Sequence, residues 1–431
     1  MHMGAGNEIP LVSFYLLPFY FMGCQECLEV FSLIAKELKK IFVVSMPMIL
    51  APLSSLLFLI IVAKGVDVKY FGDFSYVLVF FSLLVGFSDL GLKDYFLSKD
   101  GLLAGYASAS CLLGVSSFVF LIILAIQVPL VIYGGGSFLL FAVLVLEAYA
   151  LGVIHKSLYY SYQSDNRLTR FSALEVFVRP LPVLLKILIF LTFDNLVLAL
   201  LVGSISSLVV YASWLGSFDF FSGLSKKNLI IDLKRVLLDW RGWGLYSISF
   251  FSFFLYFGAD KLVIQWGLGA ESLGVYSAAM AFMGVGQIAV SVLWSLYMPR
   301  LSRGEKIWSH RQQIFLMSCL GLLVSLVYQV FAYFFFSRIY PLGYDEGVII
   351  LSVASAYFVF RFPNVVMEIY YILDCKYVDF VKMRVSFGLL CLFLISVLLP
   401  LLGLKGAAIS LVVAEMSLMF GLLLSRRRKF C

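Results

Sequence analysis

The chain has 431 residues, of which 62% are hydrophobic, 17% are aromatic and only 13% are charged. Soluble domains carry about a quarter charged residues, so this composition leaves too little polar surface for a water-soluble protein and places the chain in a bilayer. The charges cluster between apolar stretches near the roughly 20 residues that a spanning helix needs. That spacing excludes an outer-membrane barrel, whose strands alternate over about 10 residues, and a soluble enzyme with a single anchor.

The N-terminal residues 1–40 precede the first long apolar run. Residues 9–24 are apolar but short, contain Pro10 and Pro18, and follow no basic segment, which makes them a poor signal peptide. Residues 28–40 are amphipathic, as is typical of a helix that lies at the inner membrane interface. We therefore expect residues 1–40 to form an extension that ends in an interfacial helix.

Apolar runs in chain order predict an all-α polytopic membrane protein with about twelve spanning helices. They cover residues 41–63, 74–93, 102–128, 137–162, 171–192, 195–218, 244–265, 272–298, 313–336, 347–372, 385–401 and 406–425. The most charged internal connection, residues 219–241, is predicted to be a cytoplasmic amphipathic linker. It divides the chain into an N-lobe (41–218, spans 1–6) and a C-lobe (242–431, spans 7–12) with a basic tail.

The basic residues orient these spans. With both termini in the cytoplasm, 23 of the 32 Lys and Arg residues lie in cytoplasmic loops and ends, which obeys the positive-inside rule. Five lie on the opposite side, namely Lys64, Lys69, Lys261, Arg338 and Lys405. Four lie within spans, namely Lys156, Arg179, Lys186 and Arg361. The net charge of +7 is thus explained by topology, and no nucleic-acid partner is expected.

An internal repeat supports the division into two lobes. Residues 65–77 match residues 267–279 at a constant offset of 202, and each copy lies where the first span of a lobe turns into the second. The matched pairs are Gly65 with Gly267, Gly72 with Gly274, Phe74 with Tyr276, and Ser75 with Ser277. Because each lobe has an even number of spans, the sequence predicts lobes related by a pseudo-two-fold axis along the membrane normal.

Three segments resemble a known family. FGDFSYVLVFFSLLVGFSDLGL, ADKLVIQWGLGAESLGVYSAA and PLLGLKGAAISLVVAEM look like the polysaccharide-transporter family, specifically bacterial O-antigen flippases of the multidrug/oligosaccharidyl-lipid/polysaccharide exporter superfamily. The resemblance runs from about residue 28 to the C-terminus. It implies transport of a lipid-pyrophosphate-linked oligosaccharide across the bacterial inner membrane by alternating access, and its glycine and aromatic turn motifs are weak guides to the substrate.

Span 5 carries the first group of interior charges. An ionisable residue within a span usually faces a cavity or a partner, because a charge at the helix centre costs about 2.5–3.5 kcal/mol on insertion scales. In a continuous helix Glu175, Arg179 and Lys186 share one stripe, and Pro180 and Pro182 can bend it. We expect Arg179 and Lys186 to face an anion; the alternative is that Glu175 only neutralises Arg179.

Span 10 carries the corresponding polar face of the C-lobe. Its members are Tyr357, Arg361, Asn364, Glu368 and Tyr371, with Tyr370 beside them. Arg361 suits a pyrophosphate because its planar fork binds phosphate oxygens bidentately. The alternative is a salt bridge from Arg361 to another helix, with Glu147 and Glu415 as candidate partners. Tyr357, Asn364, Tyr370 and Tyr371 are candidates for contact with sugars.

Acidic residues of spans 4, 5 and 10, with two basic residues of span 4, bear on coupling. Glu147, Glu175 and Glu368 are candidate sites for a coupling proton or Na⁺, whose gradient is worth about 2.3 kcal/mol per charge per 100 mV. Lys156 lies on the opposite face from Glu147 and is expected to extend toward the cytoplasmic interface. His155 is a candidate proton relay, although a lone His beside a Lys is more often a packing residue.

These observations predict a non-enzymatic flippase with a net-cationic central cavity. No nucleotide-phosphate loop is present in the sequence, and the seven cysteines match no metal site, so no cofactor or metal is expected. The expected partners are lipid-linked oligosaccharide, membrane lipids and polysaccharide polymerase or chain-length machinery, and the chain is expected to be a monomer. One alternative is a drug or organic-cation antiporter of the same superfamily, and another is a membrane glycosyltransferase or polymerase.

Overall fold

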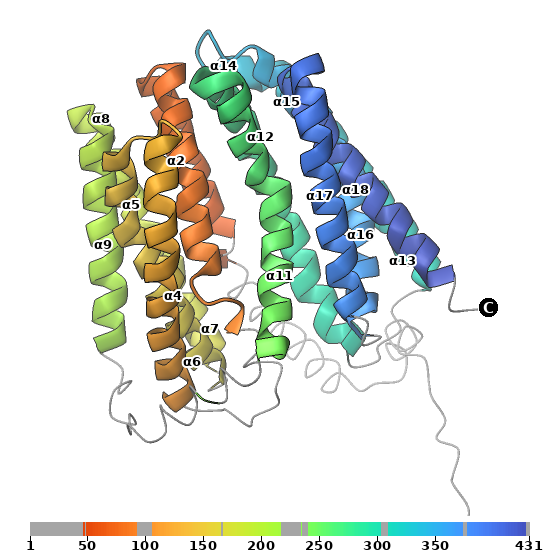
Figure 1. Cartoon of the computed structure of the whole chain (residues 1–431), viewed down its shortest axis with the longest axis horizontal. Coiled ribbons are helices and arrows are strands. Elements are labelled where there is room, and N and C mark those ends of the chain that lie inside the picture. Colours follow the sequence, from red (N-terminus) through yellow and green to blue (C-terminus); the bar gives the residue numbers. More distant parts are fainter. Residues whose placement is uncertain are drawn as a thin grey trace, which may run out of the picture.

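The computed structural model describes residues 46–47, 49–92, 106–164, 167–216, 234, 240–302, 309–373 and 377–427. All regular elements in these ranges are helices (Figure 1). The predicted N-terminal extension and most of the predicted linker 219–241 lie outside the described residues.

The first half of the chain contains seven labelled α-helices and one π-helical segment, besides an apolar helix at Ile49–Gly65. They are α2 (Val68–Phe87), α4 (Tyr106–Tyr133), α5 (Phe138–Tyr149), the π-helix η2 (Ala150–His155), α6 (Lys156–Ser164), α7 (Leu168–Val178), α8 (Leu181–Phe193) and α9 (Leu196–Gly216).

The second half repeats this plan. Its helices are α11 (Trp240–Phe257), α12 (Ala259–Ser302), α13 (His310–Phe331), the π-helix η4 (Ala332–Phe336), α14 (Ser337–Ile339), α15 (Glu346–Ser355), α16 (Tyr357–Leu373), α17 (Tyr377–Leu402) and α18 (Leu404–Arg427).

Ten continuous helical stretches of the described residues are long and apolar enough to cross a membrane. One of them, Ser247–Trp294, covers two predicted spans, because two helices follow each other directly at a kink at Gly269 (φ 84°, ψ 179°). The shorter apolar helix Ile49–Gly65 corresponds to the first predicted span. The chain is therefore a multi-pass α-helical membrane protein. Its described apolar helices account for the roughly twelve predicted spans.

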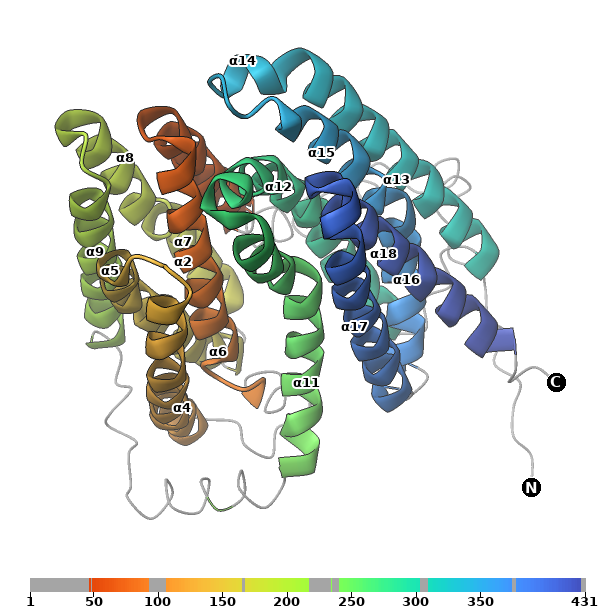
Figure 2. The ribbon, with the colours of Figure 1, turned by 45° about the horizontal axis from the view of Figure 1, so that its top comes forward.

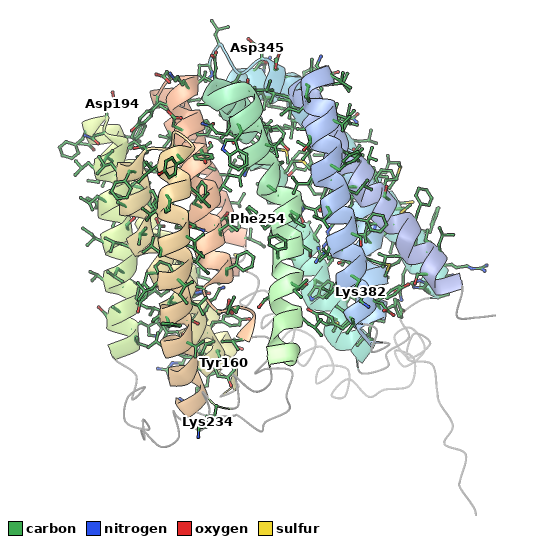
Figure 3. All side chains as sticks on the ribbon, in the orientation of Figure 1. Tyr160, Asp194, Lys234, Phe254, Asp345 and Lys382 are labelled. Carbon is green, nitrogen blue, oxygen red and sulfur yellow. The ribbon has the colours of Figure 1, made fainter. Side chains whose placement is uncertain are left out.

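The helices form two bundles. Helices α2 to α9 lie together, α13 to α18 lie together, and α11 and α12 run between them while packing on the second group (Figures 1 and 2). Tyr160, Lys234 and Lys382 lie at one end of the molecule, and Asp194 and Asp345 at the other (Figure 3). We call the first end the predicted inner end and the second the predicted outer end, following the charge pattern of the sequence.

The two lobes meet most closely where α2 crosses α12. A Cβ atom added to Gly72 would lie 1.8 Å from the carbonyl oxygen of Ala270, and one added to Gly274 would lie 2.3 Å from that of Val68. The two contacts are reciprocal, because Val68 and Ala270 are themselves separated by the offset of 202. Only glycine permits this backbone approach, which explains why glycine stands at the same place in both copies of the repeat.

A second contact between the lobes lies toward the predicted inner end. The hydroxyl of Ser247 on α11 donates to the carbonyl oxygen of Leu90, just after α2, at 2.5 Å. The rings of Phe87 and Phe251 lie beside it with centroids 6.2 Å apart. The lobes thus touch through α2 near both ends of the bundle.

Candidate functional site: buried charges inside each lobe

A cavity of about 280 Å³ lies within the N-lobe, among the helix Ile49–Gly65, α2, α5, α8 and α9. Most of its wall is apolar. Its polar and charged lining consists of Ser55, Glu147, Arg179, Lys186, Ser207 and Tyr211. The structure therefore brings two of the three predicted phosphate-binding cations, Arg179 and Lys186, to one cavity.

Lys186 and Glu147 form a buried ion pair on this cavity. The ammonium of Lys186 donates to both carboxylate oxygens of Glu147, at 2.7 and 2.6 Å, and also lies 5.7 Å from the centre of the Phe58 ring. Gly203 on α9 makes room for the lysine chain, since a Cβ there would lie 2.3 Å from the Lys186 Cγ. Each charge is thereby compensated in surroundings where an isolated one is costly.

Arg179 lies where two prolines interrupt the hydrogen bonding of span 5. Helix α7 ends at Val178 and α8 begins at Leu181, where Pro180 and Pro182 interrupt regular helix formation. The half-buried Arg179 lines the cavity, and within the described residues no carboxylate oxygen lies within 4 Å of its guanidinium. Glu175, one turn earlier, contacts the Nε2 of His155 instead.

The prolines interrupt the hydrogen bonding of span 5 but not its helical path, because Arg179 and Pro180 keep right-handed helical backbone angles and Thr169–Phe193 is one continuous apolar helix. Along this helix Glu175 contacts His155 while Lys186 contacts Glu147. His155 ends the π-helical segment η2 and packs on the rings of Phe171 and Tyr211, at centroid distances of 5.7 and 5.3 Å.

Lys156 also differs from expectation. Its ammonium donates to Asp89 Oδ1 at 2.6 Å and to the carbonyl oxygen of Gly86 at 3.0 Å. It therefore holds span 4 to the end of span 2 rather than extending toward the membrane interface.

The C-lobe charges form a separate buried network. Arg361 donates to Glu368 at 2.8 Å and to Glu415 at 3.3 Å, and Asn364 donates to the same Glu415 oxygen at 2.8 Å. Arg384 Nε lies 3.6 Å from Glu368. Two arginines thus face two glutamates, so this network is balanced in charge. Of the two partners that the sequence offered for Arg361, the structure selects Glu415, together with Glu368 from the same helix.

The tyrosines predicted to contact sugars are hydrogen-bonded within the C-lobe. Gln287 donates to the Tyr357 hydroxyl at 3.0 Å, Tyr370 pairs with Gln313 at 3.3 Å, and Tyr371 donates to the Leu422 carbonyl at 3.3 Å. Tyr357 and Tyr371 are buried, while Tyr370 is half-buried. A sugar would therefore have to replace existing partners.

One buried acid was missed as a candidate because the sequence places it at a span end. Asp260, at the start of α12 and beside Lys261, is nevertheless only 1% exposed. It lies outside the repeated segment 267–279, so the repeat did not single it out.

These features define a polytopic transporter-like fold whose interior charges lie inside two lobes. No protein-family model matches the chain, and no curated protein sequence is similar to it. Solved structures are similar. A lipid II flippase, MurJ, in an inward closed conformation shares 14% identity at a TM-score of 0.68, covering 89% of this chain and 87% of that one.

Two MATE transporters are also similar in structure. An outward-facing MATE family transporter of the MOP superfamily has a TM-score of 0.56 at 15% identity, covering 90% of this chain and 95% of that one. A MATE transporter of Vibrio cholerae has a TM-score of 0.51 at 14% identity, covering 91% and 96%. The chain therefore has the fold of this superfamily of membrane transporters, as the sequence resemblance implied.

Proposed function

We propose that the protein is a flippase that moves a polyprenyl-pyrophosphate-linked oligosaccharide, similar to an O-antigen repeat unit, from the cytoplasmic to the outer leaflet of the bacterial inner membrane. Movement occurs by ion-coupled alternating access of the two lobes, and both termini are cytoplasmic. The lipid tail stays in the bilayer while the polar head passes between the lobes. The fold shared with a lipid II flippase supports this class of activity.

The charge of the N-lobe cavity is the observation that carries the choice of cargo. Its charged lining is Glu147, Arg179 and Lys186, and Lys186 already neutralises Glu147 at both oxygens. In the part of the chain that the structure describes, the Arg179 guanidinium has no carboxylate oxygen within 4 Å. A cavity lined by a guanidinium that makes no ion pair of this kind favours an anion such as pyrophosphate, and its described lining offers no unpaired acid to a cationic drug.

Cargo binding by the other two cations requires an exchange of partners. Lys186 and Arg361 would leave Glu147 and Glu368 as phosphate oxygens replace the carboxylates, and Tyr357, Asn364, Tyr370 and Tyr371 would exchange hydrogen bonds with sugar hydroxyls. Leaving a buried carboxylate without its basic partner destabilises the protein. Glu147, Glu175 and Glu368 are therefore candidates to take up a proton or Na⁺ at that step.

The test is surface polysaccharide assembly in a strain that lacks the gene. We expect lipid-linked repeat units to accumulate on the inner leaflet, identified by mass spectrometry of the glycan, and wild-type protein to clear them. Arg179→Ala at normal protein level should abolish this rescue, and Arg179→Lys should restore part of it. Arg338→Ala, on the exposed predicted outer end, is the matched control. Full rescue by Arg179→Ala would contradict the proposed cargo site.

The alternative is a multidrug or organic-cation antiporter, which the MATE-like structures favour. A drug-resistance assay in cells that lack their own pumps separates the two functions. Resistance conferred by this protein, with unchanged polysaccharide assembly in the deletion strain, would replace the flippase proposal.

A further inference from the structure

Asp260 differs from the other buried acids of the described residues in having no basic partner. Asp89, Glu147, Glu175, Glu368 and Glu415 each contact the side chain of a Lys, His or Arg within 4 Å. Asp260 has no such nitrogen within that distance among the described residues, yet it is buried to 1% exposure. A buried carboxylate without a positive partner is costly and usually serves a function.

Two hydrogen bonds hold this carboxylate. The hydroxyl of Tyr276 donates to Oδ2 at 2.7 Å, and the backbone N–H of Lys261 donates to Oδ1 at 2.8 Å. The titratable groups that face it are Tyr276 and Lys261 on α12 and Cys391 on α17. The described residues contain no cluster of three metal-ligating side chains. This environment suits a proton better than a metal ion.

The internal repeat shows that the fold does not need an acid at this position. Asp260 and Tyr276 correspond, at the offset of 202, to Phe58 and Phe74. Those two rings pack edge to face in the N-lobe at a centroid distance of 6.4 Å. One lobe thus fills the position with an apolar pair, while the other places an ionisable pair there. Packing alone does not explain that difference.

The pair lies next to the closest contact between the lobes. Asp260 and Tyr276 lie on either side of the turn at Gly269, so their bond joins the two arms of α12. Tyr276 follows Gly274 by two residues, and Gly274 forms the crossing with Gly72. Tyr276 therefore lies on the same arm of α12 as the α2–α12 crossing, about half a helical turn away.

We propose that Asp260 is a proton-binding site that controls the α2–α12 crossing. The carboxylate takes a proton from water at the predicted outer end and becomes a neutral acid. Its charge-assisted bond from Tyr276 is thereby weakened, which frees the second arm of α12 to separate from α2. The purpose of this site rests on the proposed transport function, whereas proton binding itself does not depend on which cargo is carried.

The first test measures protonation directly. The full-length protein is placed in vesicles of phosphatidylethanolamine and phosphatidylglycerol, and infrared difference spectra are recorded between acidic and alkaline pH. We expect a protonated-carboxyl band that Asp260→Asn removes and that Asp345→Asn, in an exposed loop, retains. A spectrum unchanged by Asp260→Asn would overturn the proposal.

The second test measures the crossing. Lys69 and Glu271 are exposed and related by the offset of 202, so spin labels at Lys69→Cys and Glu271→Cys, in a cysteine-free background, flank the two glycines. We expect the distance to lengthen at acidic pH, and Asp260→Asn and Tyr276→Phe to abolish that pH response. A response that survives both substitutions would overturn the proposal. Neither test uses cargo, so failure of the polysaccharide assay would leave both results interpretable.

Discussion

The ammonium of Lys186 and the carboxylate of Glu147 lie at the centre of the N-lobe, where neither charge has another counterion in the described residues. Removing one member of such a pair leaves the other buried and uncompensated, which typically costs about 3–5 kcal/mol. Replacing both with apolar residues of similar volume often leaves the stability unchanged. Single and double substitutions can therefore separate the contribution of the pair to stability from the cargo binding proposed for Lys186.

Lys186→Met should lower the thermal unfolding midpoint of the detergent-purified protein markedly, while Lys186→Met combined with Glu147→Leu should recover most of the loss. Lys405→Met, at an exposed position, controls for the loss of one lysine. If Lys186 also binds cargo, the stable double variant should still fail to clear lipid-linked repeat units. A single Lys186→Met variant as stable as wild type would show that Glu147 is compensated in another way.

The sequence predicted which charged residues lie inside the spans. It could not predict which side chains they contact. Positions of Glu175, Arg179 and Lys186 along span 5 were evident, and Pro180 indicated a possible bend. Which side chain each of them meets depends on tertiary neighbours such as His155 and Glu147. Helical periodicity within one span contains no information about either.

At the scale of elements, the α2–α12 crossing depends on two glycines. Gly72→Ala places a methyl group 1.8 Å from the Ala270 carbonyl oxygen, so the helices must separate by more than a side-chain adjustment. We expect this variant to lose the close outer contact, seen as a longer distance between spin labels at positions 69 and 271, and to lose transport. Gly114→Ala, on α4 in open space, is the matched control and should change neither. A short distance retained in Gly72→Ala would contradict this account.

The number of spans was predicted well because length and apolarity determine it, whereas the second span, predicted at 74–93, is Val68–Phe87 in the structure. The sixth span, predicted at 195–218, is Leu196–Gly216 in the structure. The turn between the seventh and eighth spans was expected near residues 266–271, and Gly269 lies there. The sequence could not show that glycine 72 meets glycine 274, because a repeat relates positions without placing them in contact.

At the scale of the whole molecule, the lobes touch near both ends in this structure. Alternating access requires one contact to open while the other holds. A bifunctional thiol cross-linker between Leu90→Cys and Ser247→Cys, in a cysteine-free background, should join the lobes near the predicted inner end and block clearance of lipid-linked repeat units. A reducible linker should restore clearance after reduction, and each single cysteine should be active. Full activity of the cross-linked protein would show that this contact need not open.

The reciprocal crossing of α2 and α12 has a consequence for the ancestry of the chain. Gly72 meets Ala270, and Gly274 meets Val68. The repeat relates these two contacts to each other, so the crossing has the geometry of an isologous interface. Two identical half-length chains would form the same contact as a homodimer. The present protein is thus built like a tethered dimer whose two copies differ at this position, with Phe58 and Phe74 in one and Asp260 and Tyr276 in the other.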